Sequence, residues 1–196
     1  MNLAERVKGI LLAPRDEWPK IAAEPASVQS IYTTYVMLLA AIGPIVLVLA
    51  SALFDGFGLG AGFGVRAAIV DYVNALVVIA LLAAIVDVLA PSFGGRKDYV
   101  QSMKPVAYSF TSVFVAQVTL IVPVLGWLVI LLASIYGFYL FFLGAPILGR
   151  CSADKAAPFT LVVVLCAIVL SYLIQRIIFG LAGFPHSVPG AVGMLR

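Results

Sequence analysis

Hydrophobic residues in this chain gather into five long runs, and the short stretches between the runs hold most of the charged residues. A helix needs about 20 mainly apolar residues to cross the hydrocarbon core of a bilayer. We therefore expect an all-α membrane protein whose domain at residues 31–183 is a bundle of five transmembrane helices. The expected spans are residues 31–54, 66–90, 106–122, 127–148 and 158–183, with an external tail at residues 184–196.

Residues 1–30 follow a different pattern. Leu3, Val7, Ile10 and Leu11 recur at the spacing of one helix face, and charged residues lie elsewhere on the helix. An amphipathic helix of this kind typically lies in the plane of the membrane interface, which would place Trp18 at headgroup depth. The alternative is a cap that folds over the ends of the transmembrane helices. We expect the interfacial arrangement for this segment.

Composition supports a membrane protein. Of the 196 residues, 63% are hydrophobic and 11% are charged, whereas soluble domains carry about 25% charged residues. No basic face is interleaved with exposed aromatic residues, so nucleic acid is not an expected partner. One histidine and two cysteines give neither a metal-ligand set nor a disulfide framework. We expect no cofactor, no metal and no catalytic residues, and hence no enzyme.

The basic residues are unevenly distributed between the two sides that five spans would define. Nine lie on the N-terminal side and three on the other, counting one within a span. The nine are Arg6, Lys8, Arg15, Lys20, Arg96, Lys97, Lys104, Arg150 and Lys155. The positive-inside rule then predicts a cytoplasmic N-terminus and an external C-terminus. Trp18, Arg96, Lys97 and Lys104 are the candidate cytoplasmic surface, with anionic lipid headgroups as expected partners.

Two ionisable residues are expected at matching depths within the bundle. Asp71 and Arg176 each lie roughly 7–11 Å from the outer end of their span, at 1.5 Å of rise per residue. Because either charge alone would be costly there, we expect an ion pair between Asp71 and Arg176. Pairing of Asp71 with Arg66, or extension of Arg176 to the headgroups, are the alternatives.

Asp87 lies near the opposite end of the second span. We expect it to meet Arg96, Lys97 or Lys104, or to accept a hydrogen bond from Tyr108.

Hydroxyl residues follow one face of the third span. Tyr108, Thr111, Ser112 and Thr119 share that face at about 100° per residue, whereas Gln117 lies opposite. They would either line a polar groove or bond to nearby backbone carbonyls, and the second arrangement is the more common one in membrane helices.

Several short motifs, in their order and spacing, resemble the Yip1 family in its bacterial branch. The motifs are Pro14…Trp18-x-x-Ile21-x-x-Glu24, Asp87…Pro91-x-Phe93-Gly94-Gly95, Val106-Ala107-Tyr108-Ser109, Ile121-x-Pro123-x-x-Gly126 and Ile135-Tyr136-Gly137-Phe138-Tyr139-Leu140. The resemblance implies a five-helix integral membrane protein with a cytoplasmic N-terminus. Eukaryotic relatives are linked to vesicle trafficking and to small GTPases of the Rab type. Their DLYGP-type signature is absent here, so a GTPase role is not carried over.

These observations favour a non-enzymatic protein of a bacterial cytoplasmic (inner) membrane that organises the membrane or acts as an adaptor for membrane-protein partners. A small transporter, channel or lipid-moving protein that uses the polar residues inside the bundle is the alternative. Ala133, Gly137 and Gly144 form a small-residue seam that suits close helix packing. We expect this seam to pack within one chain, so a homo-oligomer is not indicated.

Overall fold

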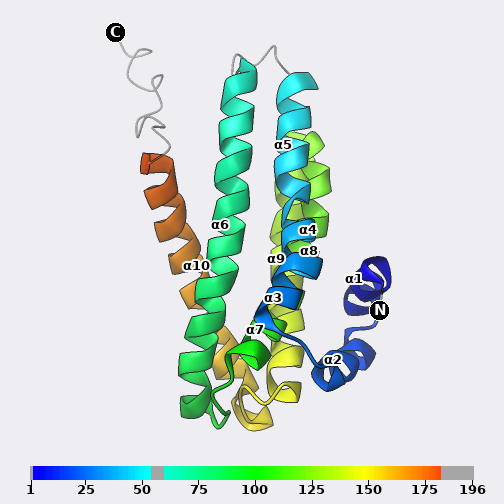
Figure 1. Cartoon of the computed structure of the whole chain (residues 1–196), viewed down its shortest axis with the longest axis vertical. Helices are drawn as coiled ribbons and strands as arrows, with labels where there is room; N and C mark the ends of the chain where they lie inside the picture. The colour runs from blue at the N-terminus through cyan, green and yellow to red at the C-terminus, as the bar shows by residue number, and fades with distance from the viewer. Residues whose placement is uncertain (1, 54–59, 182–196) are drawn as a thin grey trace.

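The computed structural model describes residues 2–53 and 60–181, and all regular secondary structure in those ranges is helical. The long helices stand side by side, and two short N-terminal helices flank the lower half of the bundle (Figure 1). Within the described ranges, four helices are long and apolar enough to cross a membrane: Val28–Leu53, Gly64–Phe93, Leu125–Ile147 and Ala153–Ile178. The tail expected at residues 184–196 lies outside the described residues, as do residues 54–59 between the first two spans and residues 182 and 183 at the end of the fifth.

The N-terminal segment forms a helical pair, α1 (Leu3–Leu12) and α2 (Pro14–Ala23). Asn2 caps α1 in a capping box with Glu5, and Pro14 occupies the first turn of α2, where its missing N–H costs nothing. Both helices pack against the body of the bundle, with α2 lying on α9 (Pro123–Ile147). The helical pair therefore lies against the side of the bundle (Figure 1).

The first span is built from consecutive helical pieces: α3 (Val28–Ile31), the π-helical turn η1 (Tyr32–Val36), α4 (Met37–Ala40) and α5 (Ile42–Leu53). It is followed by α6 (Gly60–Leu89), which ends in the 3₁₀ turn η3 (Ala90–Phe93). At 1.5 Å per residue, the 30 residues of α6 extend about 45 Å, which exceeds the ~30 Å hydrocarbon core. One end of α6 therefore reaches beyond the hydrocarbon or the helix tilts.

The third predicted span is the least regular part of the bundle. It comprises α7 (Tyr99–Ser109), α8 (Thr111–Ala116) and the 3₁₀ turn η4 (Gln117–Ile121). Because the helix is interrupted after Ser109 and tightens from Gln117, this segment is not among the four long apolar helices of the described residues. The last two expected spans form α9 and α10 (Ala156–Leu181), with the short turn η5 (Ala153–Lys155) before α10.

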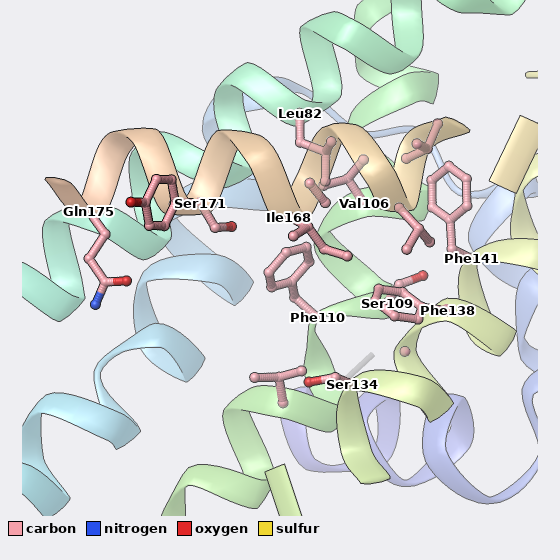
Figure 2. A pocket seen from close by; sticks show the side chains of 16 residues that line it. Leu82, Val106, Ser109, Phe110, Ser134, Phe138, Phe141, Ile168, Ser171 and Gln175 are labelled. Carbon is pink, nitrogen blue, oxygen red and sulfur yellow. The ribbon is translucent and has the colours of Figure 1, made fainter. Parts of the chain in front are cut away.

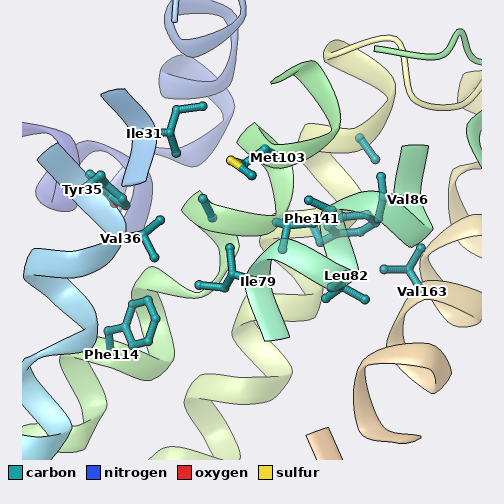
Figure 3. Packing of buried hydrophobic residues seen from close by; sticks show 14 of the residues in the cluster. Ile31, Tyr35, Val36, Ile79, Leu82, Val86, Met103, Phe114, Phe141 and Val163 are labelled. Atoms are coloured by element: carbon teal, nitrogen blue, oxygen red, sulfur yellow. The ribbon is translucent and has the colours of Figure 1, made fainter. Parts of the chain in front are cut away.

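The main hydrophobic core lies where the first span, α6, α7, α9 and α10 meet. Figure 3 shows Ile79 and Val86 of α6 packed beside Met103 of α7 and Phe141 of α9. A second cluster joins the N-terminal pair to α9 through Ile10, Trp18, Ile21, Leu140 and Leu148. The N-terminal pair therefore has an apolar interface of its own with the bundle.

Candidate functional site

Buried charges tie α1 to α2. Arg6 is 4% exposed and donates to Glu17 at 2.7 Å, and its second terminal nitrogen pairs with Glu24. Glu17 also accepts from Lys20 at 3.0 Å. A Cβ at Gly9 would come within 2.6 Å of the Glu17 Cδ, so only glycine lets the carboxylate lie flat on α1. Some of the charged residues that give this segment its amphipathic pattern therefore hold α1 and α2 together.

Lys104 connects the bundle to this pair. Its ammonium group donates to the carbonyl oxygens of Ile21 at 2.9 Å and of Glu24 at 2.8 Å, where α2 ends and carbonyls lack helical partners. Desolvation lowers the pKa of Lys104, although the charges of Glu24 and Asp98 oppose the shift. Lys104 is 1% exposed. The expectation that it meets lipid headgroups is therefore wrong, because its donors cap a helix instead.

Trp18 is likewise buried, with none of its surface exposed. Its indole ring lies against Gly144, where a Cβ would approach the ring to 2.6 Å, and it meets the Tyr108 ring edge-on at 6.3 Å between centroids. The expectation of a lipid-facing Trp18 is wrong because Gly144 opens a space on α9 that the ring fills. Gly137 similarly lies on the Ser109 carbonyl and the Ser112 hydroxyl. The predicted small-residue seam thus packs within the chain.

Asp87 belongs to a second polar cluster at the same end of the bundle. Its carboxylate accepts from the backbone N–H of Asp98 at 2.7 Å and the hydroxyl of Ser102 at 3.1 Å, and lies 3.9 Å from the Arg150 guanidinium. The expected partners were wrong: among the described residues, Arg96, Lys97 and Lys104 form no ion pair with Asp87, and Tyr108 donates no hydrogen bond to it. The charge that reaches it comes from Arg150, more than fifty residues away in the chain.

Arg150 organises that cluster. Its guanidinium donates to the carbonyl oxygens of Leu148, Arg96 and Asp98 and to the Ser102 hydroxyl, at 2.6–3.2 Å. Burial lowers the pKa of Arg150, with Asp98 and Asp87 opposing the shift. A buried arginine needs this many acceptors, and backbone carbonyls supply most of them. The connector before α7 is therefore fixed to the turn after α9.

Arg96 and Lys97 remain on the surface. Both residues are exposed, and Arg96 takes part in the contacts above only through its backbone carbonyl. Of the four residues expected to form the surface at this end, these two are the ones that the structure leaves accessible.

The polar residues of the upper bundle do not form the expected ion pair. Asp71 accepts from the Gln117 side-chain amide at 3.5 Å, and that amide lies flat on Gly43, where a Cβ would approach it to 2.6 Å. Arg176 is exposed, with its guanidinium 5.9 Å from the centre of the Tyr172 ring. No Asp71–Arg176 ion pair occurs among the described residues. The absence of a side chain at Gly43 is what makes room for the Gln117 amide.

The hydroxyl residues of the third span bond to backbone carbonyls. Thr111 donates to Tyr108 O at 2.6 Å, Thr119 to Ala116 O at 2.7 Å and Ser112 to Ala133 O at 2.8 Å. Hydroxyls that bond to preceding carbonyls often accompany bent helices and satisfy backbone groups that a break releases. Thr111, Ser112 and Thr119 thus bond to backbone carbonyls, as the second of our two alternatives stated, whereas Tyr108 lines a polar cavity. The three bonds also support the broken helix.

Two cavities adjoin these groups. A small polar one of about 310 Å³ is lined by Arg6, Glu24, Tyr35 and Tyr108. A mainly apolar one of about 430 Å³ lies between α7 and α8, α9 and α10, and Figure 2 shows Ser109, Ser134, Ser171 and Gln175 among the side chains that line it. Asp71, Ser112 and Thr119 line neither cavity.

Sequence reasoning missed the roles of Arg6, Glu17 and Arg150. The i, i+11 spacing of Arg6 and Glu17 carries no signal unless the turn at Pro14 is read as a reversal of direction. For Arg150, the only available signal was a basic residue directly after a span, which is also the usual position of an exposed charge.

Comparison with known proteins gives one match. The family model of the Yip1 domain matches residues 8–174, which is most of the chain. Neither the curated proteins nor the solved structures contain a match.

Proposed function

Because the chain belongs to the Yip1 domain family, we propose that it is a multi-pass protein of a bacterial cytoplasmic membrane with a non-enzymatic role. In this proposal it organises the membrane or acts as an adaptor, and it contacts partner proteins through the end of the bundle that carries α2 and the connector before α7. The N-terminus is cytoplasmic and the C-terminus external.

The proposal includes a fifth, broken crossing at residues 106–122. Lys104 contacts α2 just before this segment begins, and Gly126 packs on the Thr119 carbonyl where α9 starts at the other end. The turn η4 also packs against α5. These contacts at opposite ends support a segment that traverses the bundle, with the bound hydroxyls compensating for its irregular backbone.

The orientation rests on the basic residues that stay accessible at the α2 end. Six of the nine counted there are exposed: Lys8, Arg15, Lys20, Arg96, Lys97 and Lys155. Arg6, Lys104 and Arg150 are buried. The exposed six support both a cytoplasmic position and contact with anionic headgroups or acidic protein surfaces.

One observation carries the non-transport role: the ionisable groups inside the bundle are engaged with internal partners. Charged side chains in a transport path must face a cavity or water. Here Asp71, Asp87 and Lys104 bond to Gln117, to Ser102 and to the end of α2, respectively. This pattern supports a closed scaffold. A lipid-moving protein is the second candidate, and the apolar cavity beside α10 is the observation that favours it.

The two candidates differ in a transport assay. The protein would be reconstituted into liposomes and tested for ion flux and for scrambling of labelled phospholipid. We expect both rates to match those of protein-free liposomes. Substrate-dependent flux, or scrambling above the protein-free rate, would overturn the scaffold role.

The adaptor role has its own test in native membranes. A photo-crosslinking amino acid would replace Lys97, and in a matched control it would replace Val169, which lies on the exposed face of α10. We expect a discrete adduct with a protein at position 97 and lipid adducts at position 169. The absence of any protein adduct at position 97 would refute this docking surface.

A further inference from the structure

The apolar cavity beside α10 follows that helix over several turns. Its walls come from four parts of the bundle, α6, α7 with α8, α9 and α10. Along α10 the lining runs from Val163 to Gln175, which corresponds to about 18 Å of helix rise. One leaflet of the hydrocarbon core is about 15 Å deep. The cavity therefore has the length of a single acyl chain within one leaflet, and its 430 Å³ falls in the range of about 300–1,000 Å³ for small-molecule sites.

The surroundings of the cavity are also apolar. The neighbouring face of α10 exposes Leu165, Ile168 and Val169, each by more than half of its surface. In Figure 1 the C-terminal end of α10 leans away from the other helices. In a membrane, the medium next to this face is hydrocarbon. A lipid chain can therefore enter from the side without crossing an aqueous layer.

Water is a poor occupant of the inner part of the cavity. A buried water usually makes two to four hydrogen bonds. The polar side chains there are Ser109 and Ser134. The Ser134 hydroxyl already donates to the Ile130 carbonyl at 2.8 Å, so the buried, unpartnered Ser109 hydroxyl is the one side-chain group there that is open to a water, and one bond is fewer than a buried water usually makes. An empty cavity would leave its walls without dispersion contacts. An apolar chain provides those contacts.

Polar groups are concentrated at the other end of the cavity. Ser171, Tyr172 and Gln175 line it there, and the guanidinium of Arg176 lies over the Tyr172 ring on the exposed side of α10. A phosphate group is a strong partner for an arginine. The cavity thus has an apolar interior and a cationic group beside its polar end.

We propose that this cavity binds one acyl chain of a membrane phospholipid, whose phosphate contacts Arg176. The lipid comes from the leaflet at the C-terminal end of α10. Its chain fills the space between α9 and α10 and completes the packing of α10 against the bundle. This site is independent of the adaptor role, which concerns the opposite end of the protein.

The test uses the full chain in lipid nanodiscs that contain a small fraction of phosphatidylglycerol with a diazirine in one acyl chain. After illumination, the labelled residues would be mapped by mass spectrometry. We expect labelling to concentrate on cavity residues from Val163 to Ser171. Uniform labelling over all exposed apolar faces would show annular lipid only and would overturn the proposal.

Two matched variants test the cavity itself. Ala167→Trp fills it, whereas Leu165→Trp adds the same group to the exposed face of α10. Ala167→Trp should reduce cavity labelling about tenfold, equivalent to about 1.4 kcal/mol of binding, and Leu165→Trp should leave it unchanged. Equal labelling in both variants would refute the site. If Ala167→Trp does not fold, Ser134→Phe fills the same space from α9.

Arg176→Gln tests the headgroup contact. This variant should reduce labelling by the anionic phospholipid. Salt added before illumination should also suppress the labelling at a lower concentration than in the wild type. Unchanged labelling and salt dependence would remove the phosphate contact from the proposal. Because the crosslink from position 97 is measured separately, failure of the lipid site would leave the adaptor role intact, and the reverse also holds.

Discussion

Replacing Lys104 by methionine tests whether a buried charge holds the N-terminal helical pair on the bundle. Methionine keeps an unbranched apolar stem of similar length, so the change mainly removes the ammonium group. In the wild type that group donates to the carbonyl oxygens of Ile21 and Glu24. Lys104→Met leaves both oxygens without this donor while the surrounding packing stays similar.

The expected loss of stability depends on whether water can reach the carbonyl oxygens of Ile21 and Glu24. The cost of burying a charge and the attraction of its partners nearly offset each other in a satisfied site. What remains is the cost of unsatisfied carbonyls, about 1–3 kcal/mol for each one that water cannot reach. Glu24 is exposed, so water can replace its partner, whereas Ile21 is 1% exposed. We therefore expect a loss of about 2 kcal/mol, or roughly thirtyfold in the equilibrium for opening of α2.

Hydrogen exchange of the α2 backbone in nanodiscs measures this opening directly. Lys104→Met should speed exchange in the last turn of α2 by that factor, and Lys97→Met, on the exposed connector, should not. Trp18 emission provides a second readout in a Trp127→Phe background, because these are the two tryptophans of the chain. Unchanged exchange and emission in Lys104→Met would refute the anchoring role, and slower exchange would show that the buried charge is a net cost.

Three further changes have equally specific outcomes. Arg150→Lys should lower the free energy of unfolding by about 1–3 kcal/mol, because lysine lacks the planar set of donors with which arginine binds several carbonyls. Faster hydrogen exchange of the connector before α7 would show this loss. Arg176→Gln should shift the free energy of unfolding by less than about 1 kcal/mol, since an exposed cation–π contact is weak. Gln117→Leu should lower the free energy of unfolding by about 1–3 kcal/mol, and thermal unfolding in nanodiscs would measure both variants. A larger effect for Arg176→Gln than for Gln117→Leu would contradict the structure and support an Asp71–Arg176 ion pair. Burial raises the pKa of the Cys151 thiol to about 11, so alkylation at pH 8 should be roughly two hundredfold slower than for an ordinary thiol. Rapid alkylation without denaturant would contradict this.

Membrane location and most helix positions could be predicted from the sequence, because both depend on local patterns. An apolar run near the thickness of a bilayer identifies a span wherever it packs. The segment from Val106 to Val122 shows the limit of this reasoning. Its apolar content suggested one continuous helix, but the turn after Ser109 and the tight turns from Gln117 depend on contacts with α5 and α9.

Side-chain partners could not be predicted, because they depend on how distant segments meet. Trp18 and Lys104 both have the composition of interfacial residues, and both are buried only because α2 lies on α9. The room for Trp18 comes from Gly144, which the sequence marked as part of a seam without showing what fills it. Hydrophobicity and charge give the depth of a residue in the membrane, whereas a tertiary contact decides whether it meets lipid or protein.

The buried basic residues also change how the proposed docking surface should be tested. The connector that carries the exposed Arg96 and Lys97 is fixed by the carbonyl oxygens of Arg96 and Asp98, which accept from Arg150, itself 4% exposed. Arg150→Lys should therefore weaken the protein adduct formed from position 97 by moving the connector, without touching the partner. Arg96→Glu, with the crosslinking residue kept at position 97, should weaken binding of an acidic partner without changing hydrogen exchange of the connector, because the Arg96 side chain is exposed. A variant that affects both readouts acts on the fold, and one that affects only the adduct acts on recognition, so the two measurements together separate support of the surface from binding to it.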